Sequence, residues 1–149
     1  MSKIELLFDA LLENVTLHVP GTNAYALLKE FARQEIEKRF SGTEAISAEL
    51  GRFGEICLPY YAMGAIDSLD LFGLDELIIL LFYWSNRSRY RRVVDIGANL
   101  GLHTIILARC GFEVTAFEPD PVHFEILCKN VALNHVVGAD LRNAAVSVE

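Results

Sequence analysis

Residues 93–101, with the sequence VVDIGANLG, determine the fold expected for this 149-residue chain. The mainly apolar residues Val93–Ile96 predict a short strand. Gly97 and Gly101 follow it, and glycine suits a sharp turn whose backbone lies close to a ligand. Leu102–Cys110 is an apolar stretch of helical length. This part of the chain is therefore expected to form a strand, a glycine turn and a helix.

The same pattern recurs after that helix. Glu113–Glu118 predicts a second strand, and Asp120 is a good N-cap directly before Pro121, which suits the first position of a helix. A third, weaker strand is expected within residues 139–148. Strands that alternate with helices of about ten residues indicate βαβ units and hence an α/β fold with a parallel sheet.

The N-terminal part of the chain has a different, mainly helical pattern. Ser2 and Glu5 form a capping box before a helix, and a second helix is expected from about Thr22 to Arg39. The alternating residues 15–19 predict a short strand between them. A third helix, from about Asp75 to Ser85, is apolar on nearly every face and is expected to be buried on all sides. We therefore divide the chain into a helical region, 1–90, and a sheet region, 91–149.

Composition limits the partners and the compartment. The hydrophobic fraction of 52% is that of a globular protein with a large core, and the net charge of −7 argues against a nucleic-acid partner. The longest apolar run, Leu77–Trp84, is far shorter than the roughly 20 residues that span a bilayer. Three scattered cysteines and no signal-peptide pattern favour the cytoplasm. No two histidines have metal-ligand spacing, so no metal site is expected.

Two carboxylates mark the expected ligand site. Asp95 ends the first strand, where its charge suits a ligand ammonium, and Glu118 ends the second strand, roughly 20 residues past the glycine turn, where it suits the hydroxyls of a ribose. A dinucleotide fingerprint would need glycines in place of Asn99 and Leu102, so the pyrophosphate cradle is missing. S-adenosylmethionine carries no phosphate and needs no such cradle.

The motifs DIGANLGLHT, FEPDP and NVALN within residues 93–134 resemble the FkbM family of S-adenosylmethionine-dependent methyltransferases, and residues 143–147 resemble that family's third strand. The resemblance implies a class I, Rossmann-like fold, S-adenosyl-L-methionine as cofactor, and O-methylation of a hydroxyl on a small molecule or sugar. It also implies that Asp95, Gly97, Asn99 and Gly101 line the methionine portion and that Glu118 holds the ribose. The full set of expected cofactor-binding residues is Asp95, Gly97, Ala98, Asn99, Gly101, Thr104, Glu118 and Pro119.

The resemblance covers only the first half of that domain. Family members have a seven-stranded sheet and continue into an acidic Asp-x-Glu-Gly-type motif, which has no counterpart here. We therefore expect the catalytic domain to be incomplete, the 149-residue chain alone to be inactive, and its exposed sheet edge to favour self-association. No general base is identified. A non-catalytic cofactor-binding or assembly fragment and a nucleotide-dependent oxidoreductase are the alternative functions.

Three further features have two readings each. Thr104 could bind the carboxylate end of the cofactor or serve helix capping and packing. The aromatic stretch 59–64 could cover a ligand, although a packed satellite core is favoured. The arginines of residues 87–92 could bind an anionic substrate, although a solvated connector is favoured.

Overall fold

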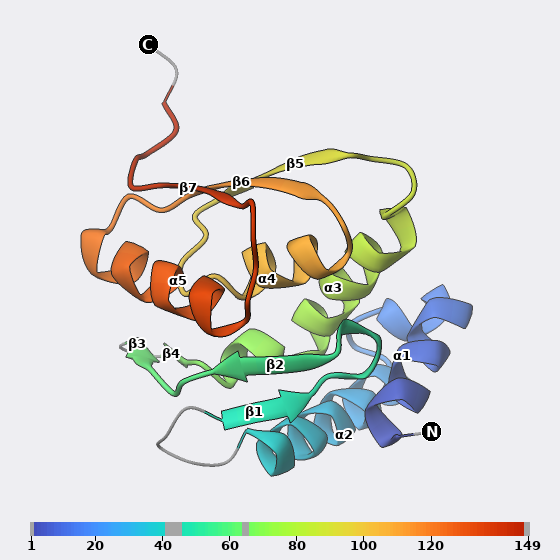
Figure 1. Cartoon of the computed structure of the whole chain (residues 1–149). Coiled ribbons are helices and arrows are strands. Elements are labelled where there is room, and N and C mark those ends of the chain that lie inside the picture. Colours follow the sequence, from blue (N-terminus) through green and yellow to red (C-terminus); the bar gives the residue numbers. More distant parts are fainter. Residues whose placement is uncertain (1, 41–45, 64–65, 148–149) are drawn as a thin grey trace. The chain divides into compact units, whose positions relative to one another are not determined.

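The structure, a computed structural model, describes residues 2–40, 46–63 and 66–147 (Figure 1). The chain forms two compact units, Met1–Phe82 and Tyr83–Glu149, and each is described by itself. The division falls within a helix, whereas the sequence analysis placed it at residues 90 and 91. The expected end of the second helix at residues 41 and 42, and Gly64 and Val148, lie outside the described residues.

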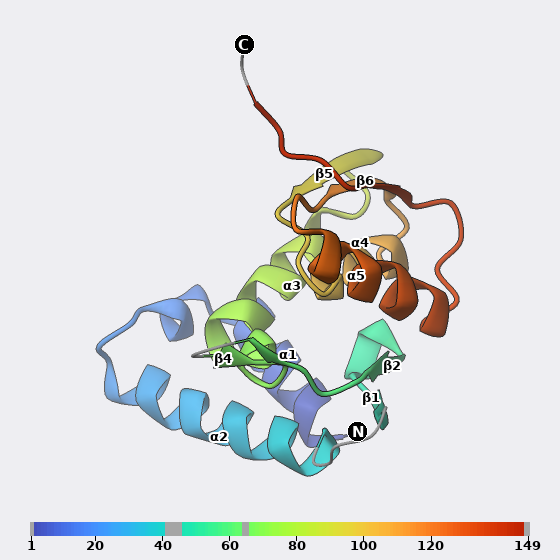
Figure 2. The same ribbon diagram turned by 90° about the vertical axis from the view of Figure 1, so that its left-hand side faces the viewer.

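Two capped helices begin the first unit. Helix α1 (Lys3–Glu13) begins after Ser2, whose side chain accepts a hydrogen bond from the Glu5 N–H, as the capping box predicted. Helix α2 (Asn23–Arg39) begins after Thr22, which caps Tyr25 in the same way. The two helices pack on each other through their apolar faces (Figures 1 and 2). The buried residues are Ile4, Leu7, Phe8 and Leu11 of α1 and Tyr25, Ala32 and Ile36 of α2.

The strand predicted for residues 15–19 is wrong. Val15–His18 form a short 3-10 helix, η1. The Asn14 side chain accepts hydrogen bonds from both the N–H and the hydroxyl of Thr16, at 3.0 and 2.6 Å. Because a short polar side chain offers the backbone a local turn in this way, the alternating pattern does not produce a strand.

Two small antiparallel sheets complete the first unit, and the sequence analysis did not predict them. Strand β1 (Ile46–Glu49) pairs with β2 (Glu55–Leu58), and β3 (Ala62–Met63) pairs with β4 (Ile66–Asp67). The turn between β1 and β2 contains the 3-10 helix η2 (Gly51–Phe53). It is fixed to α1, because Arg52 forms ion pairs with Glu5 and Asp9, both at 2.6 Å.

A short 3-10 helix, η3 (Asp70–Phe72), leads into helix α3 (Leu74–Asn86). Helix α3 buries Leu74, Leu77, Leu80 and Leu81. The expectation that it is buried on all sides is wrong, because Ile79 and Phe82 are 38% and 61% exposed. In the described part of the chain no helix is both long and apolar enough to cross a membrane.

The second unit is a parallel three-stranded sheet with helices on one face (Figure 1). Its strands β5 (Arg92–Ile96), β6 (Glu113–Phe117) and β7 (Asp140–Arg142) lie in the order β5-β6-β7. Helix α4 (Leu102–Arg109) connects the first two strands, and α5 (Pro121–Leu133) connects the last two. The three strands and both helices confirm the α/β prediction. Val94 and Ile96 of β5 lie on the face of the sheet opposite to the two helices, and they are 60% and 65% exposed.

Candidate functional site

The turn between β5 and α4 is held against the end of β6. The N–H groups of Gly97 and Ala98 both donate to the Phe117 carbonyl, at 2.9 and 3.0 Å, and the Gly101 N–H closes the turn on the Ala98 carbonyl at 2.8 Å. Asn99, which lies between Ala98 and Gly101 in the turn, adopts a left-handed conformation with φ of 49°. The turn therefore has a single fixed path at the carboxyl ends of two neighbouring strands, where open α/β sheets bind ligands.

The two glycines of this turn serve different purposes. Both have positive φ, 77° at Gly97 and 90° at Gly101. A Cβ at Gly101 would lie 2.5 Å from Cδ1 of Leu127, so this glycine lets α5 pack closely on the turn. A Cβ at Gly97 would meet nothing within 4 Å. Gly97 therefore leaves open space beside the backbone, as a bound ligand would require.

Glu118 connects the tip of β6 to the turn. Its side chain is buried, and Oε2 accepts a hydrogen bond from the Asn99 N–H at 2.8 Å while Oε1 accepts one from the Asp120 N–H at 2.9 Å. A carboxylate has about four acceptor positions, so two such bonds fix its orientation and leave capacity for hydroxyl donors. The structure thus brings the second-strand carboxylate and the glycine turn together.

Asp95 is fixed in a comparable way by helix α4. The Thr104 hydroxyl donates to Oδ2 of Asp95 at 2.6 Å, and the Thr104 side chain is fully buried. Asp95 itself is only partly buried, at the end of β5. The hydroxyl of Thr104 therefore holds the carboxylate in place, a contact that the sequence analysis did not consider for this residue.

Two asparagines support the site from a distance in sequence. Asn130 of α5 is fully buried and donates from Nδ2 to the Leu100 carbonyl at 2.8 Å. Asn143, after β7, donates from Nδ2 to the carbonyls of Glu118 and Pro119 at 2.9 and 3.2 Å. Asn130 interrupts the apolar face of its helix, and that interruption is the signal that could have identified it. Pro119 enters the site through its carbonyl and is itself exposed.

The two ends of α4 carry a histidine that is hydrogen-bonded to a tyrosine and a buried cysteine. The Tyr83 hydroxyl and Nδ1 of His103, at the start of α4, are 2.9 Å apart and share a hydrogen bond. Burial raises the pKa of the Cys110 thiol to about 11, so a thiolate is disfavoured there. Among residues 2–40, 46–63 and 66–147, no three histidine, cysteine, aspartate or glutamate side chains are grouped so that they could hold a metal ion.

Two other predicted features form hydrogen bonds and ion pairs with residues outside the glycine turn. In the stretch 59–64, the Tyr60 hydroxyl donates to Asp67 and the Tyr61 N–H donates to the Ser68 hydroxyl, so its described residues pack within the first unit. Arg91 and Arg92 both form ion pairs with Glu113, at 2.7 and 3.1 Å. These pairs join the start of β5 to the start of β6, at the end of the strands opposite to the glycine turn.

The fold is similar to that of known methyltransferases. The SAM-dependent methyltransferase from Agrobacterium tumefaciens matches with a TM-score of 0.52 and 12% identity over 72% of this chain and 34% of its own. A protein-L-isoaspartate O-methyltransferase matches with a TM-score of 0.50 and 18% identity over 95% of this chain and 42% of its own. No family model matches the chain, and no curated protein matches its sequence. The similarity establishes a Rossmann-like fold, and the chain spans less than half the length of either protein.

Proposed function

We propose that this chain forms the S-adenosyl-L-methionine-binding part of a class I methyltransferase. The observation that carries the proposal is the buried carboxylate of Glu118, which is fixed on the Asn99 N–H beside an open position at Gly97. Asp95 adds a second fixed carboxylate at the neighbouring strand tip. Two carboxylates around a bend without a phosphate cradle suit a nucleoside that carries hydroxyls and a positive charge.

Each residue has a distinct part in this proposal. Glu118 would accept hydrogen bonds from the ribose hydroxyls with the lone pairs that its two backbone donors leave, and Asp95 would face the ammonium of the methionine portion, directly or through water. Gly97, Ala98, Asn99 and Gly101 would line the ligand with backbone. Thr104 and Asn130 are positioning residues, because they hold Asp95 and the Leu100 carbonyl respectively.

The cofactor supplies an electrophilic methyl group on a sulfonium, and the protein contributes binding and alignment of the acceptor. The resemblance to the FkbM family extends the proposal to O-methylation of a hydroxyl on a small molecule or sugar. The scattered cysteines extend it to a cytoplasmic location. Such an acceptor needs a general base. None of the residues described around the turn is assigned that role.

A cofactor-binding or assembly module without catalysis is the second candidate. Among the described strands, β5 pairs only with β6, so its other edge offers N–H and C=O groups for pairing. A cofactor-binding module would share S-adenosyl-L-methionine binding with the first candidate and would differ from it in transferring no methyl group. A nucleotide-dependent oxidoreductase, the remaining alternative, would instead bind NAD.

Calorimetric titration separates binding of an S-adenosylmethionine-type nucleoside from binding of NAD. We expect the 149-residue chain to bind S-adenosylhomocysteine and not NAD. Glu118→Gln should weaken this binding roughly tenfold, because it replaces a charged acceptor of hydroxyl hydrogen bonds by a neutral one. Glu125→Gln is the matched control, since Glu125 lies exposed on α5, where it pairs with Lys129. Binding of NAD alone, or equal S-adenosylhomocysteine affinity in the folded Glu118→Gln and wild-type chains, would contradict the proposal.

A further inference from the structure

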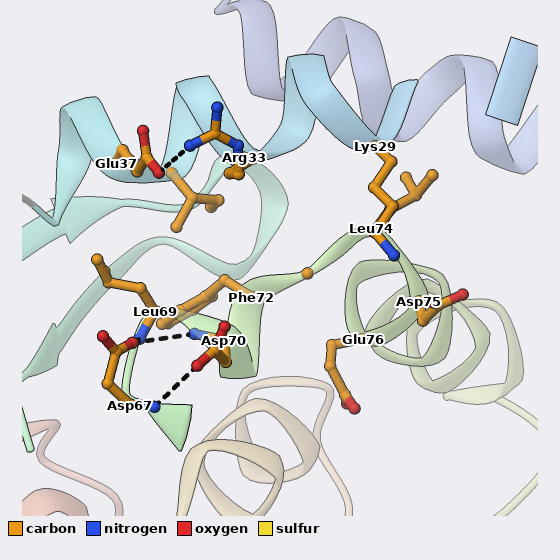
Figure 3. A pocket seen from close by; sticks show the side chains of 12 residues that line it. Lys29, Arg33, Glu37, Asp67, Leu69, Asp70, Phe72, Leu74, Asp75 and Glu76 are labelled. Atoms are coloured by element: carbon orange, nitrogen blue, oxygen red, sulfur yellow. Dashed lines mark hydrogen bonds and ion pairs between the residues drawn. The ribbon is translucent and has the colours of Figure 1, made fainter. Parts of the chain in front are cut away.

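The first unit contains a pocket of about 410 Å³ between α2 and the start of α3 (Figure 3). The apolar residues Ile36, Phe72 and Leu74 of its lining are at most 2% exposed, so they offer a ligand no surface. The second unit differs, because its strand β5 exposes the side chains of Val94 and Ile96 to 60% and 65%. Apolar surface that a partner can reach therefore lies on β5.

Two hydrogen bonds show which residues of β5 face β6. The Arg91 carbonyl accepts an N–H from β6, and the Gly97 N–H donates to a carbonyl of β6, both at 2.9 Å. The backbone groups of successive residues alternate in direction along a strand. The N–H and C=O groups of Arg92, Val94 and Ile96 therefore point away from β6. We call this side of β5 the open edge, because β5 pairs only with β6 among the described strands.

The residues of the open edge also carry the exposed apolar side chains. Because side chains alternate between the two faces of a sheet, Arg92, Val94 and Ile96 share one face, and it is the face that α4 and α5 leave uncovered (Figure 1). Parallel sheets are normally covered on both faces, and an apolar open edge is a template for pairing with another chain. One row of residues thus presents both unpaired backbone and apolar side chains.

We propose that two copies of this chain pair through the open edges of β5, antiparallel and across a two-fold axis at Val94. This register places Val94 opposite Val94 of the second copy and Arg92 opposite Ile96, so all five residues of the strand are paired. A register shifted along the strand would leave residues unpaired at both ends. The proposal does not depend on cofactor binding by the glycine turn.

The charges of β5 are compatible with this register. Arg92 lies opposite Ile96 of the second copy, whose side chain can pack on the aliphatic part of the arginine. On the other face, Asp95 lies opposite Val93. No like charges of the strand are therefore placed directly opposite each other, which would be destabilising. Arg92 can keep its own ion pair with Glu113, at 3.1 Å. Because the row fits itself, a second copy is favoured over an unrelated extended peptide.

The short length of β5 limits the strength of the dimer. Five residues span about 17 Å of strand. Stable interfaces bury roughly 1,200–2,000 Å² in total, and pairing along one short strand lies at or below the lower end of this range. We therefore expect a reversible dimer with a Kd on the order of 100 μM.

The test is sedimentation equilibrium of the full chain from roughly 10 μM to 1 mM, a range that spans the expected Kd, with amide hydrogen exchange measured by NMR at both ends. We expect a monomer–dimer equilibrium, and slower exchange of the Arg92, Val94 and Ile96 N–H groups at the higher concentration. The Val93 and Asp95 N–H groups face β6 and should not change. A monomer throughout, association beyond a dimer, or a dimer with unchanged exchange at the open edge would overturn the proposal.

Charges introduced at Val94 sharpen the test. Val94→Lys places two lysines opposite each other and should weaken dimerisation roughly tenfold. Val122→Lys is the matched control, because Val122 is 65% exposed on α5 and lies outside the open edge. An equimolar mixture of Val94→Lys and Val94→Glu chains should restore the dimer, since opposite charges then face each other. Equal weakening by Val122→Lys, or no recovery in the mixture, overturns the proposal. If either Val94 variant fails to fold, the exchange measurement on the wild-type chain decides.

Discussion

Replacing Gly101 by alanine tests the packing of α5 on the glycine turn. Gly101 has φ of 90°, a conformation that costs an L-residue about 1–2 kcal/mol. The new Cβ would also lie 2.5 Å from Cδ1 of Leu127, whose side chain is fully buried and has little room to move. Overpacking of this kind costs about 1–3 kcal/mol. We therefore expect Gly101→Ala to lower the free energy of unfolding by about 2–5 kcal/mol.

The assay is urea denaturation followed by the fluorescence of Trp84, the single tryptophan of the chain. Gly138→Ala is the control, because Gly138 has a similar φ of 86° but open space around its Cβ position. It should lose only the conformational part, about 1–2 kcal/mol. Leu127→Ala removes the clashing atom. The double variant Gly101→Ala/Leu127→Ala should therefore lose less unfolding free energy than the sum of the losses in the two single variants. Equal losses in Gly101→Ala and Gly138→Ala would refute the reasoning.

Three further predictions concern single contacts. Gly51→Ala should destabilise the first unit by about 1–3 kcal/mol in urea denaturation, because the new Cβ would lie 2.1 Å from Oε2 of Glu5 and displace the ion pair between Glu5 and Arg52. The Cβ position of Gly21 is open, so a loss in Gly51→Ala no larger than that in Gly21→Ala would count against this prediction. Thr104→Val should cost about 1–2 kcal/mol by removing the hydrogen bond to Asp95, while Thr104→Ser should recover most of the loss. The N–H groups of His123 and Val122 hold the pKa of Asp120 below its ordinary value. The ionised Asp120 side chain therefore stabilises the fold above the pKa that it has in the unfolded chain, and this contribution is lost as the pH falls through its pKa in the folded chain. Denaturation between pH 5 and pH 2 should show a smaller loss of stability in Asp120→Asn than in the wild-type chain.

Local patterns were sufficient for the second unit. The apolar run before Gly97 predicted β5, and Asp120 followed by Pro121 predicted the start of α5, because caps and turn glycines act on the residues beside them. In the first unit, Ser2 located the start of α1 for the same reason. In these three elements the determinant of the structure lies beside the element in sequence, and the prediction was confirmed.

Contacts between distant residues explain what was missed. The turn of the β1–β2 hairpin is fixed by Arg52 on Glu5, a pair 47 residues apart, and β1 and β2 have only four residues each. The support that Asn130 gives to Leu100 spans 30 residues, so the helical pattern could mark Asn130 as unusual but could not identify its partner. The strand expected at residues 15–19 failed for the opposite reason, because the local turn formed by Asn14 prevailed over alternation.

The site was predictable in its positions and not in its contacts. The ends of β5 and β6 located Asp95 and Glu118 at one edge of the sheet, because parallel neighbouring strands end together. The bond from the Asn99 N–H to Glu118 and the bond from Thr104 to Asp95 depend on side-chain directions that spacing does not specify. Ligand contacts at these residues stay a prediction.

A crystal structure of this chain grown with S-adenosylhomocysteine tests the central claim most directly. We predict the ribose hydroxyls within hydrogen-bond distance of the Glu118 carboxylate and the amino group of the ligand on the side of Asp95, with the nucleoside lying over Gly97. A nucleoside bound elsewhere, or a phosphate group preferred in the turn at residues 97–101, would contradict it.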